Sequence, residues 1–220
     1  MMEAKAAATA TPDIVLPWQG HDRKGDPITL RLAERRDAIA WIEHLRRITS
    51  ETAFMLQSQE DPLPTPAEQK SLLEEYAGRA GSVAILAARP GEPPGRQEIL
   101  GTVTLASGRS RRTEHVAELS MGVGQAWWGR GIGDLLMRAV LTSVRATPAL
   151  RRVSLLVFAD NAGARHLYEH YGFAIEGVLH RYVRWEGGTA DLVAMALDAE
   201  SLRDPRPAAR SGAGGRGAHA

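Results

Sequence analysis

Three glycines at alternate positions, Gly129, Gly131 and Gly133, lie between an expected strand and an expected helix. Glycine lets the backbone curl where a Cβ would obstruct it. The start of the following helix presents unpaired N–H groups and the positive end of the helix dipole. Such a loop is suited to hold a phosphate group, and its donors would be the main-chain N–H groups of Gly129, Arg130, Gly131, Ile132 and Gly133.

Three interpretations of this loop compete. A P-loop of nucleotide hydrolases is excluded because no Lys follows the glycines. A dinucleotide-binding fold is disfavoured, because the spacing is Gly-x-Gly-x-Gly and the loop lies past the middle of the chain. A plain glycine turn without a ligand stays open on the glycines alone.

The segments on either side of the loop narrow the choice. Residues 115–123 partly alternate, with Leu119, Met121 and Val123 on one face, which predicts a strand. After the loop, apolar residues recur at helical spacing until Pro148 ends the helix. The short apolar run Val153–Phe158 then predicts a strand. Asp160 or Asn161 can cap the start of the next helix, and Gly172 can end it.

Two motifs in this region carry a resemblance to a known family. Trp128-Gly129-Arg130-Gly131-Ile132-Gly133 resembles the pyrophosphate loop of the GNAT superfamily of N-acyltransferases, Gln/Arg-x-x-Gly-x-Gly/Ala, with Trp128 in place of the usual Gln or Arg. The segment 161–173 is similar to that family's Asn-x-x-Ala-x-x-Leu-Tyr-x-x-x-Gly-Phe signature. Two motifs in the right order are far more specific than either alone.

The resemblance implies an α/β (α+β) fold with a central mixed, mostly antiparallel twisted sheet of about seven strands and about four helices. The chain can be divided in the same order, βααβββαβαββ. The expected elements are a strand Ile28–Leu32, a helix from Glu34 or Asp37 to Ile48, a helix capped by Thr65, strands Ser82–Arg89 and Ile99–Ser107, the region described above, and a hairpin of Ile175–Trp185 with Thr189–Leu197. We expect one GNAT acetyltransferase domain over 23–200, a flexible extension over 1–22 and a disordered basic tail over 201–220.

The resemblance also implies acetyl transfer from acetyl-CoA to a primary amine. Beside the loop, the main chains of Met121 and Val123 would pair with the pantetheine arm, and the Met121 N–H would polarise the thioester carbonyl. Trp128 and Asn161 complete the expected cofactor-binding set.

Two residues are candidates for proton transfer. Tyr168 occupies the family's general-acid position and would protonate the departing thiolate, and the alternative is a packing role on an apolar stripe. Glu118 lies on the strand before the loop, where relatives place a base, and the alternative is a solvated carboxylate.

The acceptor is left open among small-molecule amines, amino acids, antibiotics and peptide N-termini. The family places it between the loop 50–64 and the hairpin 181–191, where Glu51, Glu60 and Asp61 could attract a cationic amine. A second class of function also stays open, a GNAT-fold module that binds acyl-CoA as a sensor without turnover.

Composition excludes several other classes. The chain of 220 residues has no Cys, which removes disulfides and thiolate chemistry, and its net charge of +1 argues against nucleic acid as a partner. No apolar run is long enough to span a membrane, and the start does not resemble a signal peptide, so we expect a cytoplasmic protein without a membrane partner. His166 and His170 are four residues apart but have no third ligand, so no metal site is expected. Monomer and homodimer are both left open.

Overall fold

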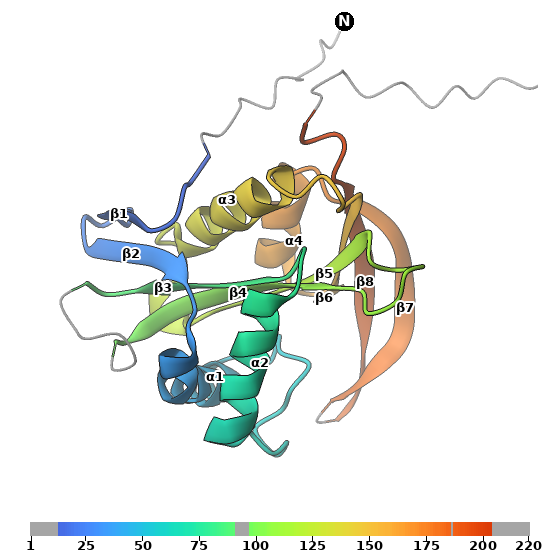
Figure 1. The fold of residues 1–220 in the computed structure, drawn as a ribbon. Coiled ribbons are helices and arrows are strands. Elements are labelled where there is room, and N and C mark those ends of the chain that lie inside the picture. Colours follow the sequence, from blue (N-terminus) through green and yellow to red (C-terminus); the bar gives the residue numbers. More distant parts are fainter. Residues whose placement is uncertain (1–12, 91–96, 186, 204–220) are drawn as a thin grey trace, which may run out of the picture.

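The computed structural model describes residues 13–90, 97–185 and 187–203. Its strands form one eight-stranded sheet in the order β1-β2-β3-β4-β5-β6-β8-β7, with every neighbouring pair antiparallel except β5 and β6 (Figure 1). The strands are β1 Trp18–His21, β2 Pro27–Leu32, β3 Val83–Ala88, β4 Ile99–Ser107, β5 Val116–Val123, β6 Arg152–Phe158, β7 Ala174–Trp185 and β8 Gly188–Asp198. The helices are α1 Ala38–Glu51, α2 Pro66–Gly78, α3 Ile132–Arg145 and α4 Ala162–His170, with short 3-10 turns at Arg35–Asp37 and Gln125–Trp127.

The helices cover the two faces of the sheet in pairs. Helices α3 and α4 lie on one face, and α1 and α2 lie on the other (Figure 1). The larger buried cluster packs α3 against the middle of the sheet, and a smaller cluster joins α1 and α2 to β3 and β4. Apolar residues at helical spacing on α3 account for this packing, because burial of that stripe removes its apolar surface from water.

The two parallel strands diverge halfway along their length. The pairing of β5 with β6 runs from Val116↔Arg152 to Glu118↔Ser154 and then ends. Beyond that point β5 continues to pair with β4 as far as Val123, while β6 continues with β8 as far as Phe158. The sheet therefore opens into a V-shaped gap whose vertex lies at Glu118.

The predicted order of helices and strands is confirmed, and the local signals that predicted their ends are present. Thr65 caps α2 in a reciprocal capping box with Glu68, and the Asn161 side chain accepts a hydrogen bond from the Ala164 N–H at 3.1 Å. Gly172 follows α4 with φ of +88°, the left-handed conformation that glycine adopts without strain.

The N-terminal boundary predicted from the sequence was wrong for residues 13–22. Instead of a flexible extension, Trp18–His21 forms strand β1, which pairs with β2, and Ile14 is buried in the main core. The run is short, polar and broken by a glycine, so it lacks the alternation that identified the longer strands. Residues 1–12 of that extension lie outside the described residues.

The C-terminal boundary is also displaced by a few residues. The Arg203 Nη2 donates hydrogen bonds to the carbonyl oxygens of Val144, Thr147 and Leu150 at 2.8, 2.7 and 3.0 Å. These carbonyls lie at and beyond the end of α3, where a helix leaves acceptors unpaired. Arg203 therefore belongs to the domain, and the predicted tail from 204 onward lies outside the described residues.

The described residues contain neither a candidate membrane-spanning helix nor a cluster of possible metal ligands. No helix in that part of the chain has the length and apolar character that crossing a membrane requires. Among the same residues, no three or more His, Cys, Asp or Glu side chains gather where they could hold a metal ion.

Candidate functional site

The glycine loop leads from the end of β5 into α3. Gly129 and Gly131 have φ of +71° and +87°, conformations that cost an L-residue with a side chain, and Gly131 is the N-cap of α3. The loop therefore curls over the first turn of α3, where the N–H groups of a helix lack intrahelical partners. This arrangement provides main-chain donors and a positive helix end for an anion.

The side chain of Arg130 is turned away from this anion site. Its guanidinium forms ion pairs with Asp22 and Asp26 and stacks on the buried Trp127 ring, with 4.3 Å to the ring centroid. Burial opposes ionisation of Asp22, but hydrogen bonds from Asp26, Lys24 and Arg130 hold the pKa of Asp22 below its ordinary value. Only the main chain of Arg130 remains for phosphate binding, and its side chain anchors the loop to the β1–β2 turn.

The register of β4 and β5 determines which main-chain groups face the gap. Gly124 donates to Leu100 and Gly108 donates to Val116, both at 3.0 Å, so the even-numbered residues of β5 exchange hydrogen bonds with β4. The odd-numbered residues Met121 and Val123 direct their N–H and C=O groups the other way, toward the region from which β6 has diverged. An extended amide chain could pair there as an additional strand.

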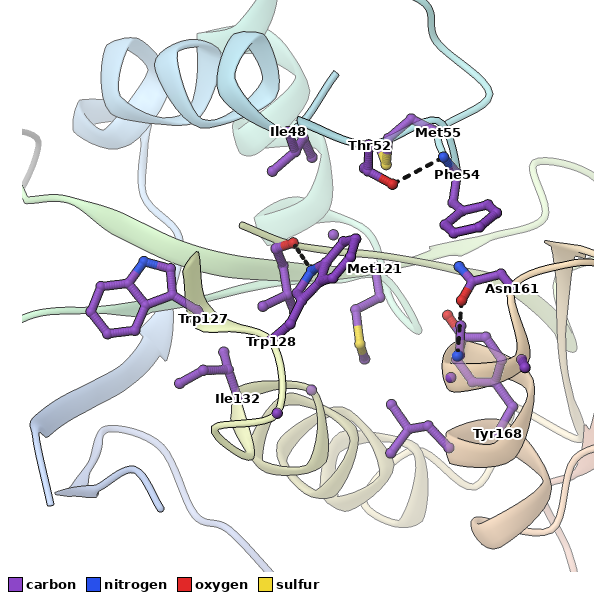
Figure 2. A pocket seen from close by; sticks show the side chains of 18 of the residues that line it. Ile48, Thr52, Phe54, Met55, Met121, Trp127, Trp128, Ile132, Asn161 and Tyr168 are labelled. Atoms are coloured by element: carbon purple, nitrogen blue, oxygen red, sulfur yellow. Dashed lines mark hydrogen bonds between the residues drawn. The ribbon is translucent and has the colours of Figure 1, made fainter. Parts of the chain in front are cut away.

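One of these groups already has a partner. The Trp128 Nε1–H donates to the Val123 carbonyl oxygen at 2.8 Å (Figure 2). The Trp128 side chain is nevertheless 47% exposed, so its indole lies at the mouth of the site rather than in the core. Because a carbonyl oxygen can accept two hydrogen bonds, a ligand can pair with Val123 beside this indole N–H or in its place.

A cavity of about 560 Å³ connects the loop, the strand gap and α4. Figure 2 shows Ile48, Thr52, Phe54 and Met55 on one side of it, and Ile132 and Tyr168 on the opposite side. Its lining, within the described part of the chain, comprises Ile48, Thr52, Phe54, Met55, Met121, Gly122, Val123, Trp127, Trp128, Gly129, Gly131, Ile132, Gly133, Asp160, Asn161, Ala162, Gly163, Ala164, Leu167 and Tyr168. This volume is within the ordinary range of small-molecule sites.

Tyr168 projects from α4 into this cavity. Its ring packs against Phe173 with 5.8 Å between the centroids, so this side chain both packs in the core and lines the cavity. Burial raises the pKa of Tyr168 to about 12, since the phenolate would lose hydration. The hydroxyl therefore remains protonated at neutral pH and can donate a proton.

The other predicted site residues are distributed unevenly. Asn161 lines the cavity, but its side-chain oxygen is used to cap α4. Glu118 is exposed at the vertex of the strand gap and is not among the described residues that line the cavity. The structure thus brings Met121, Val123 and Tyr168 together and leaves Glu118 at the edge.

The hypothesis that acidic residues of the α1–α2 loop attract an amine finds no support in their positions. The Glu51 carboxylate accepts a hydrogen bond from the Gln125 N–H at 2.7 Å, and the Asp61 carboxylate accepts one from the Ser58 N–H at 2.7 Å. Neither these two nor Glu60 is among the described lining residues, whereas Asp160 is.

Several lining residues were not identified from the sequence. Ile48, Thr52, Phe54 and Met55 come from the end of α1 and the loop after it, where no periodicity or motif marks a side chain as part of a site. The one available signal was an apolar triplet, Phe54-Met55-Leu56, inside an otherwise polar loop. Phe54 contacts Phe158 at the end of β6, with 5.9 Å between ring centroids, so the loop is anchored across the gap.

Comparisons with known proteins agree with this geometry. A model of the acetyltransferase (GNAT) family matches residues 44–173, which include both motifs. The chain is 30% identical over 169 residues to the L-amino acid N-acetyltransferase AaaT of Escherichia coli strain K12, and the match covers 77% of this chain and 96% of that relative.

Solved structures show the same fold. An acetyltransferase of the GNAT family from Streptococcus pneumoniae has a TM-score of 0.72 and 29% identity, with 78% of this chain and 98% of that chain covered. A GNAT superfamily phosphinothricin acetyltransferase (Pat) from Sinorhizobium meliloti, in complex with acetyl-CoA, has a TM-score of 0.66 and 19% identity, with 78% and 88% covered.

Proposed function

The chain belongs to the acetyltransferase (GNAT) family and is an acetyl-CoA-dependent N-acetyltransferase, and from this premise we propose that its acceptor is an L-α-amino acid with an apolar side chain. The observation that carries the proposal is the apolar wall formed by Ile48, Phe54 and Met55 on the side of the cavity opposite Tyr168. An apolar side chain that leaves water for such a wall gains free energy in proportion to the area buried. The relative of Escherichia coli that acetylates L-amino acids supports the same acceptor class.

Acetyl-CoA would occupy the other end of the cavity. Its pyrophosphate accepts hydrogen bonds from the main-chain N–H groups between Gly129 and Gly133, at the N-terminus of α3. Its pantetheine amides pair with the outward-facing main chains of Met121 and Val123. The acetyl group then lies in the strand gap, within reach of both α4 and the apolar wall.

The chemical step needs one proton donor and one proton acceptor. The amine nitrogen attacks the thioester carbonyl carbon, the new C–N bond forms, and the C–S bond breaks as electrons leave with the sulfur. The Met121 N–H stabilises the negative charge on the carbonyl oxygen. Tyr168 gives its proton to the departing sulfur, and solvent returns a proton to the phenolate before the next turnover.

Glu118 would remove the proton from the amine by way of solvent. Its exposed position at the vertex of the strand gap supports transfer through water rather than direct contact with the acceptor. We expect Glu118→Gln to move the rising acid limb of the turnover profile to higher pH and to leave the Kd of CoA unchanged. An unchanged pH profile would assign Glu118 to the solvated surface.

A panel of acceptors tests the proposed function. Thiol release from acetyl-CoA is measured with L-phenylalanine, L-methionine and L-leucine as acceptors. L-glutamate, L-lysine, spermidine and a hexapeptide are tested separately and represent the alternative acceptor classes. The apolar amino acids should give the largest kcat/KM, and their D-enantiomers and N-methylated forms should react poorly. A preference for the polyamine or the peptide would overturn the acceptor class, and binding of acetyl-CoA without thiol release for any amine would favour an acyl-CoA sensor.

A further inference from the structure

The turn between β1 and β2 lies against the glycine loop. The Arg23 N–H donates to the Arg130 carbonyl oxygen at 3.0 Å, and Asp22 and Asp26 form ion pairs with the Arg130 guanidinium from the same turn. Asp22 is buried, and it also accepts hydrogen bonds from the N–H groups of Lys24 and Asp26 at 2.9 Å. The turn is therefore held in one position relative to the loop.

This position brings the Arg23 side chain over Gly131. A Cβ added to Gly131 would lie 3.1 Å from the Arg23 Nε and 3.2 Å from its Cγ. Gly131 is both the N-cap of α3 and part of the cavity lining. The guanidinium of Arg23 consequently lies beside the main-chain donors at the anion-binding end of the cavity.

Within the described residues, the lining at the anion-binding end of the cavity lacks a free positive charge, and Arg23 can supply one. The described lining of the cavity contains no Lys or Arg, and the one cation of the loop, Arg130, is matched by two carboxylates. That cluster carries one net negative charge, while CoA brings a pyrophosphate and a 3′-phosphate. Arg23 is exposed and has no ion-pair partner among the described residues, so its charge is available to a ligand.

From this arrangement we propose that Arg23 binds a phosphate group of acetyl-CoA, and that the Asp22–Arg130–Asp26 cluster holds the turn so that it can do so. A guanidinium can donate two parallel hydrogen bonds to a phosphate, which makes such a pair stronger than a neutral hydrogen bond. The turn lies outside residues 44–173 matched by the family model, so the contact adds a cation from a segment that the family motifs do not include. The inference rests on the co-substrate alone and does not depend on which amine accepts the acetyl group.

Calorimetry with CoA and dephospho-CoA tests this proposal. Arg23→Gln keeps the aliphatic stem over Gly131 and removes the charge, and we expect it to raise the Kd of CoA about tenfold. Arg23→Lys should recover part of the loss. The effect of Arg23→Gln should shrink as salt is added, because screening weakens an exposed ion pair.

The dephospho-CoA measurements identify the phosphate. If the difference between Arg23→Gln and the unaltered protein vanishes with dephospho-CoA, the partner is the 3′-phosphate, and if it persists, the partner is the pyrophosphate. Arg112→Ala is the matched control, because it removes one exposed positive charge from the turn at the opposite end of β5. Equal Kd values for CoA in Arg23→Gln and the unaltered protein, or an equal loss in Arg112→Ala, would overturn the proposal.

Discussion

The two ends of the cavity are constructed from different parts of the chain. The end that faces α3 presents main-chain groups and left-handed glycines, and the cluster of Asp22 with Arg130 lies outside the cavity and anchors the loop, so the shape of this end is fixed by backbone geometry and charge. The end that faces the α1–α2 loop consists of the side chains of Ile48, Phe54 and Met55, and Phe54 is 37% exposed. A fixed end suits a co-substrate that is always the same molecule, whereas a wall of exchangeable side chains suits an acceptor that differs between relatives.

The largest effect is expected at the fixed end. Gly131→Asp adds a Cβ at a φ of +87° and a negative charge at the proposed phosphate site, so it should abolish detectable CoA binding in calorimetry. Gly187→Asp is the matched control, because Gly187 has a similar φ of +86° and an added Cβ would meet nothing within 4 Å. Normal CoA binding by Gly131→Asp would remove the loop from the site.

The next effect concerns the step between the two ends. Tyr168→Phe should lower kcat about a hundredfold and leave the Kd of CoA nearly unchanged, since we propose that the hydroxyl protonates the sulfur only as it departs. Tyr171→Phe is the control, because the Tyr171 hydroxyl bonds the Asp134 carboxylate at 2.7 Å and lies outside the described cavity lining.

The pH dependence of turnover gives a second test of Tyr168. Its pKa of about 12 predicts that kcat will show no fall from deprotonation of this phenol between pH 7 and 10. Turnover by Tyr168→Phe at the rate of the unaltered protein would assign Tyr168 to packing against Phe173.

A smaller effect is expected at the acceptor end. Phe54→Ala removes part of the apolar wall and its contact with Phe158, so the KM of an apolar amino acid should rise about tenfold while the Kd of CoA stays within twofold. Leu56→Ala provides the comparison, because Leu56 is 56% exposed in the same loop and is not among the described lining residues. Equal KM values for Phe54→Ala and the unaltered protein would show that the acceptor binds elsewhere.

The smallest effect is expected for a substitution that lowers stability and changes neither end of the cavity. Arg203→Ala removes hydrogen bonds to three carbonyls near the end of α3, which should lower the free energy of unfolding by about 1 kcal/mol without changing kcat or KM.

Deletion of residues 204–220 keeps Arg203 and should leave the melting temperature unchanged. A deletion that melts several degrees lower would show that the tail packs against the domain or a second copy.

The contrast between an end shaped by the backbone and an end shaped by side chains also explains which features the sequence could predict. The order of helices and strands, the glycine loop and Tyr168 follow from periodicity, caps and two motifs, because backbone conformation restricts which residues are allowed at those positions. The GNAT family inferred from those motifs is confirmed by the family model. Strand β1 was missed because a four-residue edge strand with one glycine has almost no periodic signal.

Phe54, Met55 and Arg23 could not be predicted as site residues, because they reach the site only through the tertiary fold. Phe54 and Met55 reach the cavity from an irregular loop, and Arg23 reaches Gly131 through a turn more than a hundred residues earlier in the chain. Such contacts depend on tertiary packing, and nothing in the local spacing of residues encodes them.

Additivity of substitutions at the two ends tests most directly whether they bind their ligands independently. The Kd of CoA and the KM of an apolar L-amino acid are measured for Arg23→Gln, Phe54→Ala and the double variant. Distant sites that share no partner have additive free energies, so Arg23→Gln should change only the Kd, Phe54→Ala only the KM, and the double variant should show both changes within about twofold of their separate values. A Phe54→Ala variant that loses CoA affinity as strongly as Arg23→Gln would contradict the division of the cavity into a fixed co-substrate end and an exchangeable acceptor end.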